Sequence, residues 1–302
     1  MAVAIPPVTR SRSVQKRRQT LVAYAFLFPT LLIFLVFRHG PAVASLLLGF
    51  FNWTIVDTPE FVGLNNYDRM IHDDIFWRSL KNTGLFVLMT VPTDVVLALF
   101  LAVLVNQRLR GMWLFRLAFF MPFVTATAIV AIVWRWIYQP QGIANGALEF
   151  FGLDPLTWLS DPDWALPAVA IMSVWKHVGF NMLILVAGLQ AIPQDYEEAA
   201  RLDGAGPLSI FFGITLPLLR PVLVLVTILT TIGSFQVFDA AYVMTNGGPF
   251  YATTTVVYYI YQNAFGQYQM GYAAAIAFAL FMIVLVLTVL QRRFLGGGDD
   301  VY

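Results

Sequence analysis

Six long apolar runs constrain the fold of this 302-residue sequence more than any other feature. Each comes close to the roughly 20 mostly apolar residues that a helix needs to cross the hydrocarbon core of a bilayer. Hydrophobic residues make up 59% of the chain and charged residues 12%, which excludes a soluble globular protein, a disordered chain and a nucleic-acid-binding protein. The predicted spans are Thr20–Phe37, Gly84–Val105, Leu114–Trp134, Ala165–Leu189, Pro221–Met244 and Ala273–Leu290.

These runs predict an all-α polytopic membrane protein with six transmembrane helices. The first run is too long, and too poor in small residues at a cleavage site, to be a removed signal peptide. We therefore expect an uncleaved first helix, which continues weakly toward Phe51 after an interruption at Gly40 and Pro41.

Most basic residues lie on alternate sides of these spans, and only the loop between the first and second spans is mixed, with Arg38, Arg69, Arg78 and Lys81 against five acids. The segments 138–164 and 245–271 contain no Lys or Arg. Because cytoplasmic loops carry an excess of Lys and Arg, both termini are expected in the cytoplasm, with a basic arm at residues 1–19 and a tail at 295–302. The basic residues on the expected inner side are Arg10, Arg12, Lys16, Arg17, Arg18, Arg108, Arg110, Arg116, Arg201, Arg220, Arg292 and Arg293.

Motifs for catalysis and for metal binding are missing from the sequence. There is no cysteine, and no glycine-rich phosphate loop ends in Gly-Lys. The three histidines, His39, His72 and His177, are too scattered to suggest a metal site. We expect no catalytic residue, no metal and no cofactor in this chain.

The segment 193–217, between the fourth and fifth spans, predicts a short helix, a turn and a second helix on the cytoplasmic side. Asp195 is placed to cap the first helix, and Glu198 to complete a capping box. Gly204 is placed to end that helix, because glycine tolerates a positive φ.

The second helix of this segment is expected to begin at Pro207, since proline suits a first helical turn. Pro217 and Pro221 are then expected to break the helix before the fifth span. On physical grounds alone, the segment could equally be an amphipathic elbow that tethers two spans at the membrane surface.

The same segment resembles the EAA loop of importer-type ABC permeases, whose pattern is E-A-A, three residues, G, nine residues, I-x-L-P. Every fixed position and both spacings match. Two further stretches, Phe61–Tyr67 and Thr245–Pro249, resemble the carbohydrate-uptake branch of these permeases. The residues that match the EAA pattern and its extension are Glu198, Ala199, Ala200, Asp203, Gly204, Ala205, Ile214, Leu216 and Pro217.

This resemblance implies the type I ABC importer permease fold over residues 20–294, in the cell inner (plasma) membrane, without a large inserted outer domain. It implies a transport subunit and not an enzyme. The implied partners are a second, similar permease, two cytoplasmic ATPase subunits that bind ATP and Mg²⁺, and an extracytoplasmic solute-binding protein. The EAA segment would dock on the ATPases and couple them to the spans.

Three alternatives remain open at this point. One is an importer of glycerol 3-phosphate or a glycerophosphodiester. Another is a stand-alone secondary transporter or channel, although no convincing repeat relates spans 1–3 to spans 4–6. The last is a membrane-embedded transferase, which the missing catalytic cluster disfavours.

Polar residues inside the fourth and fifth spans are candidates for contact with a solute, because polar groups are costly in a membrane and need a partner or a task. Neighbouring aromatic residues, Phe180, Phe235 and Phe238, would add flat apolar faces for a sugar. The alternative is a polar network that holds helices together. The candidate substrate residues are Trp175, Lys176, His177, Asn181, Ser234, Gln236 and Asp239.

Lys176 and Asp94 both lie near the middle of their spans. An ion pair between them would reduce the cost of burying either charge, and this structural pair is the favoured interpretation. The functional alternative is that Lys176 attracts an anionic solute.

Overall fold

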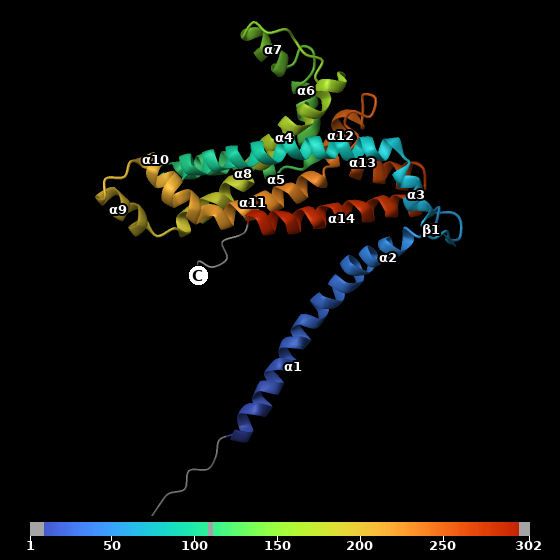
Figure 1. The fold of residues 1–302 in the computed structure, drawn as a ribbon, viewed down its shortest axis with the longest axis horizontal. Coiled ribbons are helices and arrows are strands. Elements are labelled where there is room, and N and C mark those ends of the chain that lie inside the picture. The colour runs from blue at the N-terminus through green and yellow to red at the C-terminus, as the bar shows by residue number, and fades with distance from the viewer. Residues whose placement is uncertain (1–8, 108–110, 296–302) are drawn as a thin grey trace, which may run out of the picture.

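The computed structural model describes residues 9–107 and 111–295, and these are almost entirely helical. Four long helices lie side by side and form the body of the fold (Figure 1). Helix α4 contacts α8 and α11, and α11 also contacts α14. The four helices are α4 (Asp74–Val105), α8 (Pro162–Ala191), α11 (Leu216–Phe235) and α14 (Met270–Leu295).

Five helical stretches in the described part of the chain are long and apolar enough to cross a membrane, or six if one bent pair of helices counts as a single span. Five of the six predicted runs fall within one of these stretches, and the fifth run, Pro221–Met244, extends beyond its stretch, which ends at Phe235. The predicted all-α polytopic fold is therefore confirmed, but three of the six spans differ from the prediction in their continuity.

The first span is a single long helical rod. It consists of α1 (Thr9–Ile33), a π-helical segment (Phe34–His39) and α2 (Gly40–Leu48). The interruption expected at Gly40 and Pro41 is wrong, because Pro41 lies in the first turn of α2, where its missing N–H is tolerated.

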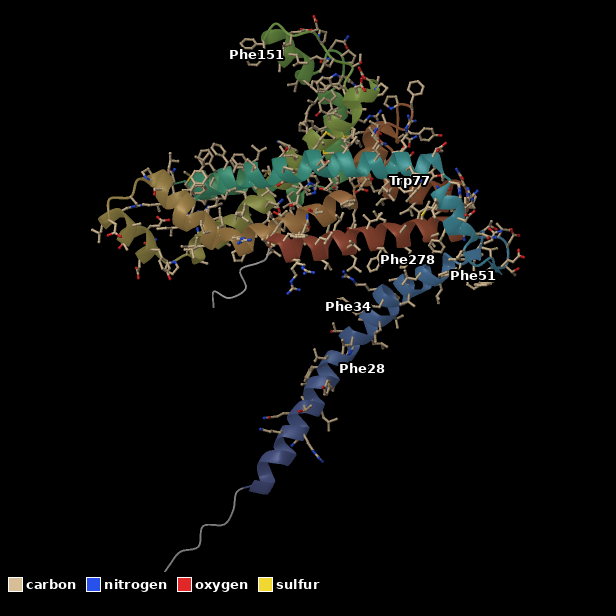
Figure 2. All side chains as sticks on the ribbon, viewed as in Figure 1. Phe28, Phe34, Phe51, Trp77, Phe151 and Phe278 are labelled. Atoms are coloured by element: carbon tan, nitrogen blue, oxygen red, sulfur yellow. The ribbon has the colours of Figure 1, made fainter. Side chains whose placement is uncertain are left out.

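This first span has little contact with the rest of the chain. It leads away from the other long helices, with α2 packed on α14 (Figure 1). Phe28 and Phe34 lie on the part that projects into space (Figure 2), and they are 62% and 43% exposed. No residue in the most apolar stretch of Lys16–Leu48 is buried.

The third span is broken. Helices α5 (Met112–Val124) and α6 (Thr127–Ile137) are bent by 99° at Thr125 and Ala126. The expectation of one continuous helix over Leu114–Trp134 is therefore wrong. The expected inner residues Arg108 and Arg110 lie outside the described residues.

The fifth span differs from the prediction in the position of its break. The helix is continuous at Pro217 and Pro221, where a break was expected, and it is broken further along the chain. A π-helical segment (Phe211–Thr215) joins α10 (Pro207–Ile210) directly to α11, so Pro217 and Pro221 do not interrupt the helix. Pro217 lies in the first turn of α11, a position that needs no N–H donor. The break comes instead at residues 236–238, before α12 (Asp239–Thr245).

Short elements cover one end of the long helices. Helix α6 carries α7 away from them (Figure 1). The two described strands pair in antiparallel fashion, with Phe51 opposite Phe61. The elements at this end are β1 (Phe51–Asn52), β2 (Glu60–Phe61), α3 (Asn65–Ile71), α13 (Val256–Tyr261) and a π-helical segment (Gln262–Gly266), whereas α7 spans Ile143–Phe150.

Helices α5 and α8 approach each other closely at Gly179. A Cβ atom at this position would lie 1.8 Å from the carbonyl oxygen of Phe119. Only glycine allows this backbone contact, since real Cβ atoms do not come this close to other heavy atoms. The contact fixes the end of α5 against the middle of α8.

Asp73 fixes the start of α4. Its Oδ1 accepts hydrogen bonds from the N–H groups of Ile75 at 2.9 Å and Phe76 at 3.3 Å, and its Oδ2 accepts from the hydroxyls of Tyr259 at 2.6 Å and of Tyr272. Burial raises the pKa of Asp73, but the four hydrogen bonds outweigh burial and hold the pKa below its usual 3.8. This carboxylate therefore ties α4 to α13 and α14.

Candidate functional site

The two helix breaks meet at one cavity of about 430 Å³, which lies among α4, α5, α8, α11 and α12. At membrane depth, non-helical backbone is tolerated only where it is buried in protein or lines a water-filled cavity. The cavity is therefore the leading candidate site for a solute. Its polar lining residues are Thr90, Asp94, Thr127, Ser173, His177, Asn181, Thr230, Ser234, Gln236 and Asp239.

The structure brings five of the seven candidate substrate residues together around this cavity. It places Trp175 and Lys176 elsewhere. Trp175 is 45% exposed and packs edge-on against Trp134, with 5.5 Å between ring centroids. The five that line the cavity are His177, Asn181, Ser234, Gln236 and Asp239.

The polar groups of the cavity are linked across three helices. The Nδ2 of Asn181 donates to Asp94 Oδ1 at 2.8 Å and to Thr230 Oγ1 at 2.9 Å. The hydroxyls of Thr90 and Ser234 lie 3.0 Å apart. These bonds join α4, α8 and α11 at one level, so part of the polar lining also holds helices together.

His177 is oriented by its own helix. Its Nδ1 lies 2.8 Å from the carbonyl oxygen of Ser173. Because a carbonyl only accepts, Nδ1 carries the proton, and Nε2 of the neutral ring is left as a hydrogen-bond acceptor. Such an acceptor suits a hydroxyl group of a solute.

The expected ion pair between Lys176 and Asp94 is wrong. The two salt bridges within the described residues are His72–Asp68 and Arg201–Glu197. Lys176 Nζ instead donates to the carbonyl oxygen of Phe123 at 3.0 Å. The physical reason is that residues of one helix point in different directions, about 100° apart from one residue to the next. On α8, Lys176 points toward the end of α5, whereas Asn181 points toward Asp94.

The aromatic part of the site was predicted only in part. Phe180 and Phe238 line the cavity as expected, but Phe235 is buried in a core next to α13 and α14. The sequence reasoning missed Phe123, which stacks on Phe180 with 4.3 Å between centroids and 10° between planes. Pro122 is a signal in the sequence that could have indicated a break next to Phe123, because proline in an apolar run often marks a helix break.

The segment between α8 and α11 is the second candidate site. It forms the predicted helix, turn and second helix, with α9 at Gln194–Leu202 and α10 at Pro207–Ile210. The capping role predicted for Asp195 and Glu198 is wrong, because the N-cap residue of α9 is Pro193, two residues before Asp195, and no side chain caps the helix.

Gly204 ends α9 as predicted, with a φ of +84°. The N–H of Gly204 donates to Arg201 O at 3.1 Å, and the N–H of Ala205 donates to Ala200 O at 2.9 Å. These two bonds make the Schellman turn that commonly closes a helix. Asp203 is the last residue before the turn, so Ala200, Asp203, Gly204 and Ala205 act as one rigid unit.

The other residues of the EAA pattern lie on either side of that turn. Glu198 and Ala199 are exposed on α9. Ile214 is half-buried in the π-helical segment, and Pro217 is exposed in the first turn of α11. The neighbouring Glu197 accepts from Thr215 Oγ1 at 3.5 Å, which ties α9 to the start of the fifth span.

The fold, the cavity between broken helices and the protruding helical segment define an integral membrane component of a transport system. Residues 76–295 match the family model described as binding-protein-dependent transport system inner membrane component. The chain belongs to this family, the permease subunits of ABC importers. Its role is therefore transport and not catalysis.

Curated relatives align along nearly the whole chain. The probable ABC transporter permease YesP of Bacillus subtilis is 38% identical over 93% of this chain and 92% of its own. The trehalose/maltose transport system permease of Thermococcus litoralis is 38% identical over 92% of this chain and 95% of its own. The sn-glycerol-3-phosphate permease of Yersinia pestis is 35% identical over 90% and 92%.

A solved structure shows the same fold. The crystal structure of a bacterial alginate ABC transporter, in complex with a periplasmic protein that holds an alginate pentasaccharide, matches with a TM-score of 0.81. It is 21% identical, over 92% of this chain and 95% of the solved chain. The expected type I importer permease fold is thus confirmed.

Proposed function

We propose that this permease imports a neutral sugar, and that the sugar crosses the membrane through the cavity between the two helix breaks. The observation that carries this proposal is the mixed lining of the cavity. Phe123, Phe180 and Phe238 offer flat apolar faces, while amide, hydroxyl and imidazole groups offer hydrogen-bond partners. A sugar presents the same combination of apolar ring faces and hydroxyl groups.

The charge of the cavity argues against an anionic solute. Among the described residues that line it, none is a lysine or arginine, and Asp94 and Asp239 are acidic. Lys176, the one nearby cation considered for an anionic solute, is held at the end of α5. Glycerol 3-phosphate stays as the second candidate, because one relative at 35% identity is a permease for it.

For the partner subunits, we propose two ATPases that bind ATP and Mg²⁺ and that also bind the segment 193–217. The exposed surface of this segment supports such a contact. Leu202, Leu208 and Phe212 are 90%, 72% and 62% exposed, and Glu198 and Asp203 are exposed nearby. Exposed large apolar side chains that lie close together are typical of a protein interface.

A second permease subunit is the proposed partner for the first span. The apolar rod Lys16–Leu48 has no buried residue in its most apolar stretch, and contact with another subunit would give it a packing partner besides lipid. Both termini are proposed to lie in the cytoplasm, so that an extracytoplasmic solute-binding protein delivers the sugar on the side of α7 and α13.

Reconstitution of the whole importer in proteoliposomes tests this function. The vesicles receive ATP inside and the solute-binding protein outside, together with a mixture of glucose, maltose, trehalose, lactose and glycerol 3-phosphate. Mass spectrometry of the vesicle contents then reports what is imported. We expect uptake of a neutral sugar that depends on ATP.

Two substitutions connect that uptake to the cavity. We expect Asn181→Leu and Ser234→Ala to lower sugar uptake. The control is Thr227→Ala, which should leave uptake unchanged, because the Thr227 hydroxyl donates to Leu223 O of its own helix and does not line the cavity. Uptake of glycerol 3-phosphate alone would favour the second candidate. Uptake without the ATPase subunits would contradict the proposal.

A further inference from the structure

A row of aromatic rings leads away from the cavity along α12 and α13. It starts at Phe238, which lines the cavity and stacks on Tyr242 with 5.4 Å between centroids and 14° between planes. Tyr242 lies 5.5 Å from Tyr261, and Tyr261 lies 5.4 Å from Phe265. Tyr261 also lies 5.0 Å from Phe238, so these three rings form a cluster next to the cavity and Phe265 extends it outward. The four rings are here called the aromatic track.

One face of the aromatic track is exposed, and the other face packs against a buried tyrosine. Tyr242, Tyr261 and Phe265 are 40%, 36% and 59% exposed. Tyr258 packs against Phe238 and Tyr242 but is 7% exposed, and its hydroxyl donates to Asn246 O at 3.0 Å. A simple packing cluster would bury its rings, whereas this one presents successive rings outward from a rigid support.

The chemistry of the track suits a carbohydrate. The π-faces of aromatic rings are electron-rich, and the C–H edges of a pyranose ring form a weakly positive, apolar face that lies well on them. The hydroxyls of Tyr242 and Tyr261 can pair with sugar hydroxyls. The segment 245–271, which carries the outer half of the track, contains no charged residue, so no strong electrostatic contact would hold a solute in place.

We propose that the aromatic track is the entry path for the sugar, which slides from the binding protein over Phe265, Tyr261 and Tyr242 to Phe238 and the cavity. This inference rests on the proposed function, because it assumes a sugar as the solute. It adds a second, extended binding surface to the cavity itself.

The test uses the reconstituted importer and the sugar that it takes up from the mixture described above. The readout is the number of sugar molecules imported per ATP hydrolysed, with loaded binding protein in excess. The test variant is the double substitution Tyr242→Leu and Tyr261→Leu. The rescue variant is Tyr242→Phe with Tyr261→Phe, and the control is Phe100→Leu with Phe281→Leu, two exposed aromatic residues on α4 and α14 outside the track.

Leucine keeps apolar bulk but removes the ring faces, so we expect the sugar-to-ATP ratio of the double leucine variant to fall roughly three- to tenfold. ATP hydrolysis stimulated by the binding protein should persist. The phenylalanine variant and the control should keep the wild-type ratio. Tyr261→Leu alone, a milder change at an exposed ring, should lower the ratio about twofold.

An unchanged sugar-to-ATP ratio in both leucine variants would contradict the aromatic track as an entry path, while leaving the proposed function intact. A parallel loss of uptake and of stimulated ATP hydrolysis would also overturn it, because that result indicates a packing role. A failure of the phenylalanine rescue would show that hydroxyls, not ring faces, matter. Absence of sugar uptake by the wild type would instead contradict the proposed function.

Discussion

The ammonium group of Lys176 lies 3.0 Å from the main-chain carbonyl oxygen of Phe123 and donates a hydrogen bond to it. It also lies 5.4 Å from the centroid of the Phe123 ring. Helix α5 ends at Val124, where the last carbonyls lack intrahelical partners and carry partial negative charge. Lys176 therefore stabilises the 99° bend that opens one wall of the cavity.

Replacing Lys176 by methionine keeps an unbranched apolar side chain that is one atom shorter, and removes the charge and the donors. We expect a loss of about 1.5–3 kcal/mol, typical of a hydrogen bond to a charged group, seen as a lower melting temperature of the purified complex in detergent. Lys81→Met, at an exposed position on α4, is the matched control and should leave the melting temperature unchanged. A stable Lys176→Met complex that selectively loses uptake of glycerol 3-phosphate would indicate a substrate role instead.

Gly204→Asp should uncouple the transporter. The φ of +84° strains any side chain, so the turn that joins α9 to α10 would shift, although no atom lies within 4 Å of a Cβ at this position. We expect normal membrane insertion and loss of ATP hydrolysis stimulated by the loaded binding protein. Gly206→Asp adds the same charge two residues away, at a φ of −75°, and should retain stimulation. Loss in both variants would point to charge and not to turn geometry.

Gly179→Ala should disturb the contact between α5 and α8. The new methyl group would lie 1.8 Å from the carbonyl oxygen of Phe119, so the helices must separate at a cost of roughly 1–3 kcal/mol. Gly84→Ala on α4 is the control, since nothing lies within 4 Å there and alanine favours a helix. A melting temperature of Gly179→Ala equal to that of the wild type would contradict the close packing.

The sequence predicted the number of spans and the turn at Gly204 because both depend on local signals. Apolar runs of sufficient length predict spans, and Gly204 after Ala199 and Ala200 predicts a helix end. The helix breaks at Thr125 and at Gln236 were not predictable from hydropathy, because proline and polar residues also occur inside unbroken helices, as Pro92 and Asp94 do in α4. The cavity depends on these breaks.

Pairing of side chains was harder to predict than their depth. Lys176 and Asp94 were expected to meet because both are near mid-span, but depth does not determine the direction in which a side chain points. Asn181 took the place of Lys176 as the partner of Asp94. The neighbouring His177, Asn181 and Ser234 were correctly grouped at one cavity, since residues that share a helical face meet the same neighbours.

Asp73 should make the stability of the complex depend on pH in the acidic range. Its pKa is lower in the folded protein than the usual 3.8. A lowered pKa means that the carboxylate stabilises the fold above the unfolded pKa, and that this stabilisation is lost as the pH falls below about 4. Asp73→Asn removes the titration, so its melting temperature should change less between pH 5 and pH 3. An equal change in both proteins would exclude Asp73 as the source.

The most direct test of the proposed function asks whether ATPase subunits bind the segment 193–217 on the cytoplasmic side of the membrane. Because the sequence has no cysteine, a single Leu202→Cys, at a position that is 90% exposed, can be labelled cleanly with a membrane-impermeant maleimide. The account predicts labelling from the cytoplasmic side of inverted vesicles, and protection when the ATPase subunits are bound. Labelling from the outer side, or the same labelling with and without the ATPases, would contradict it.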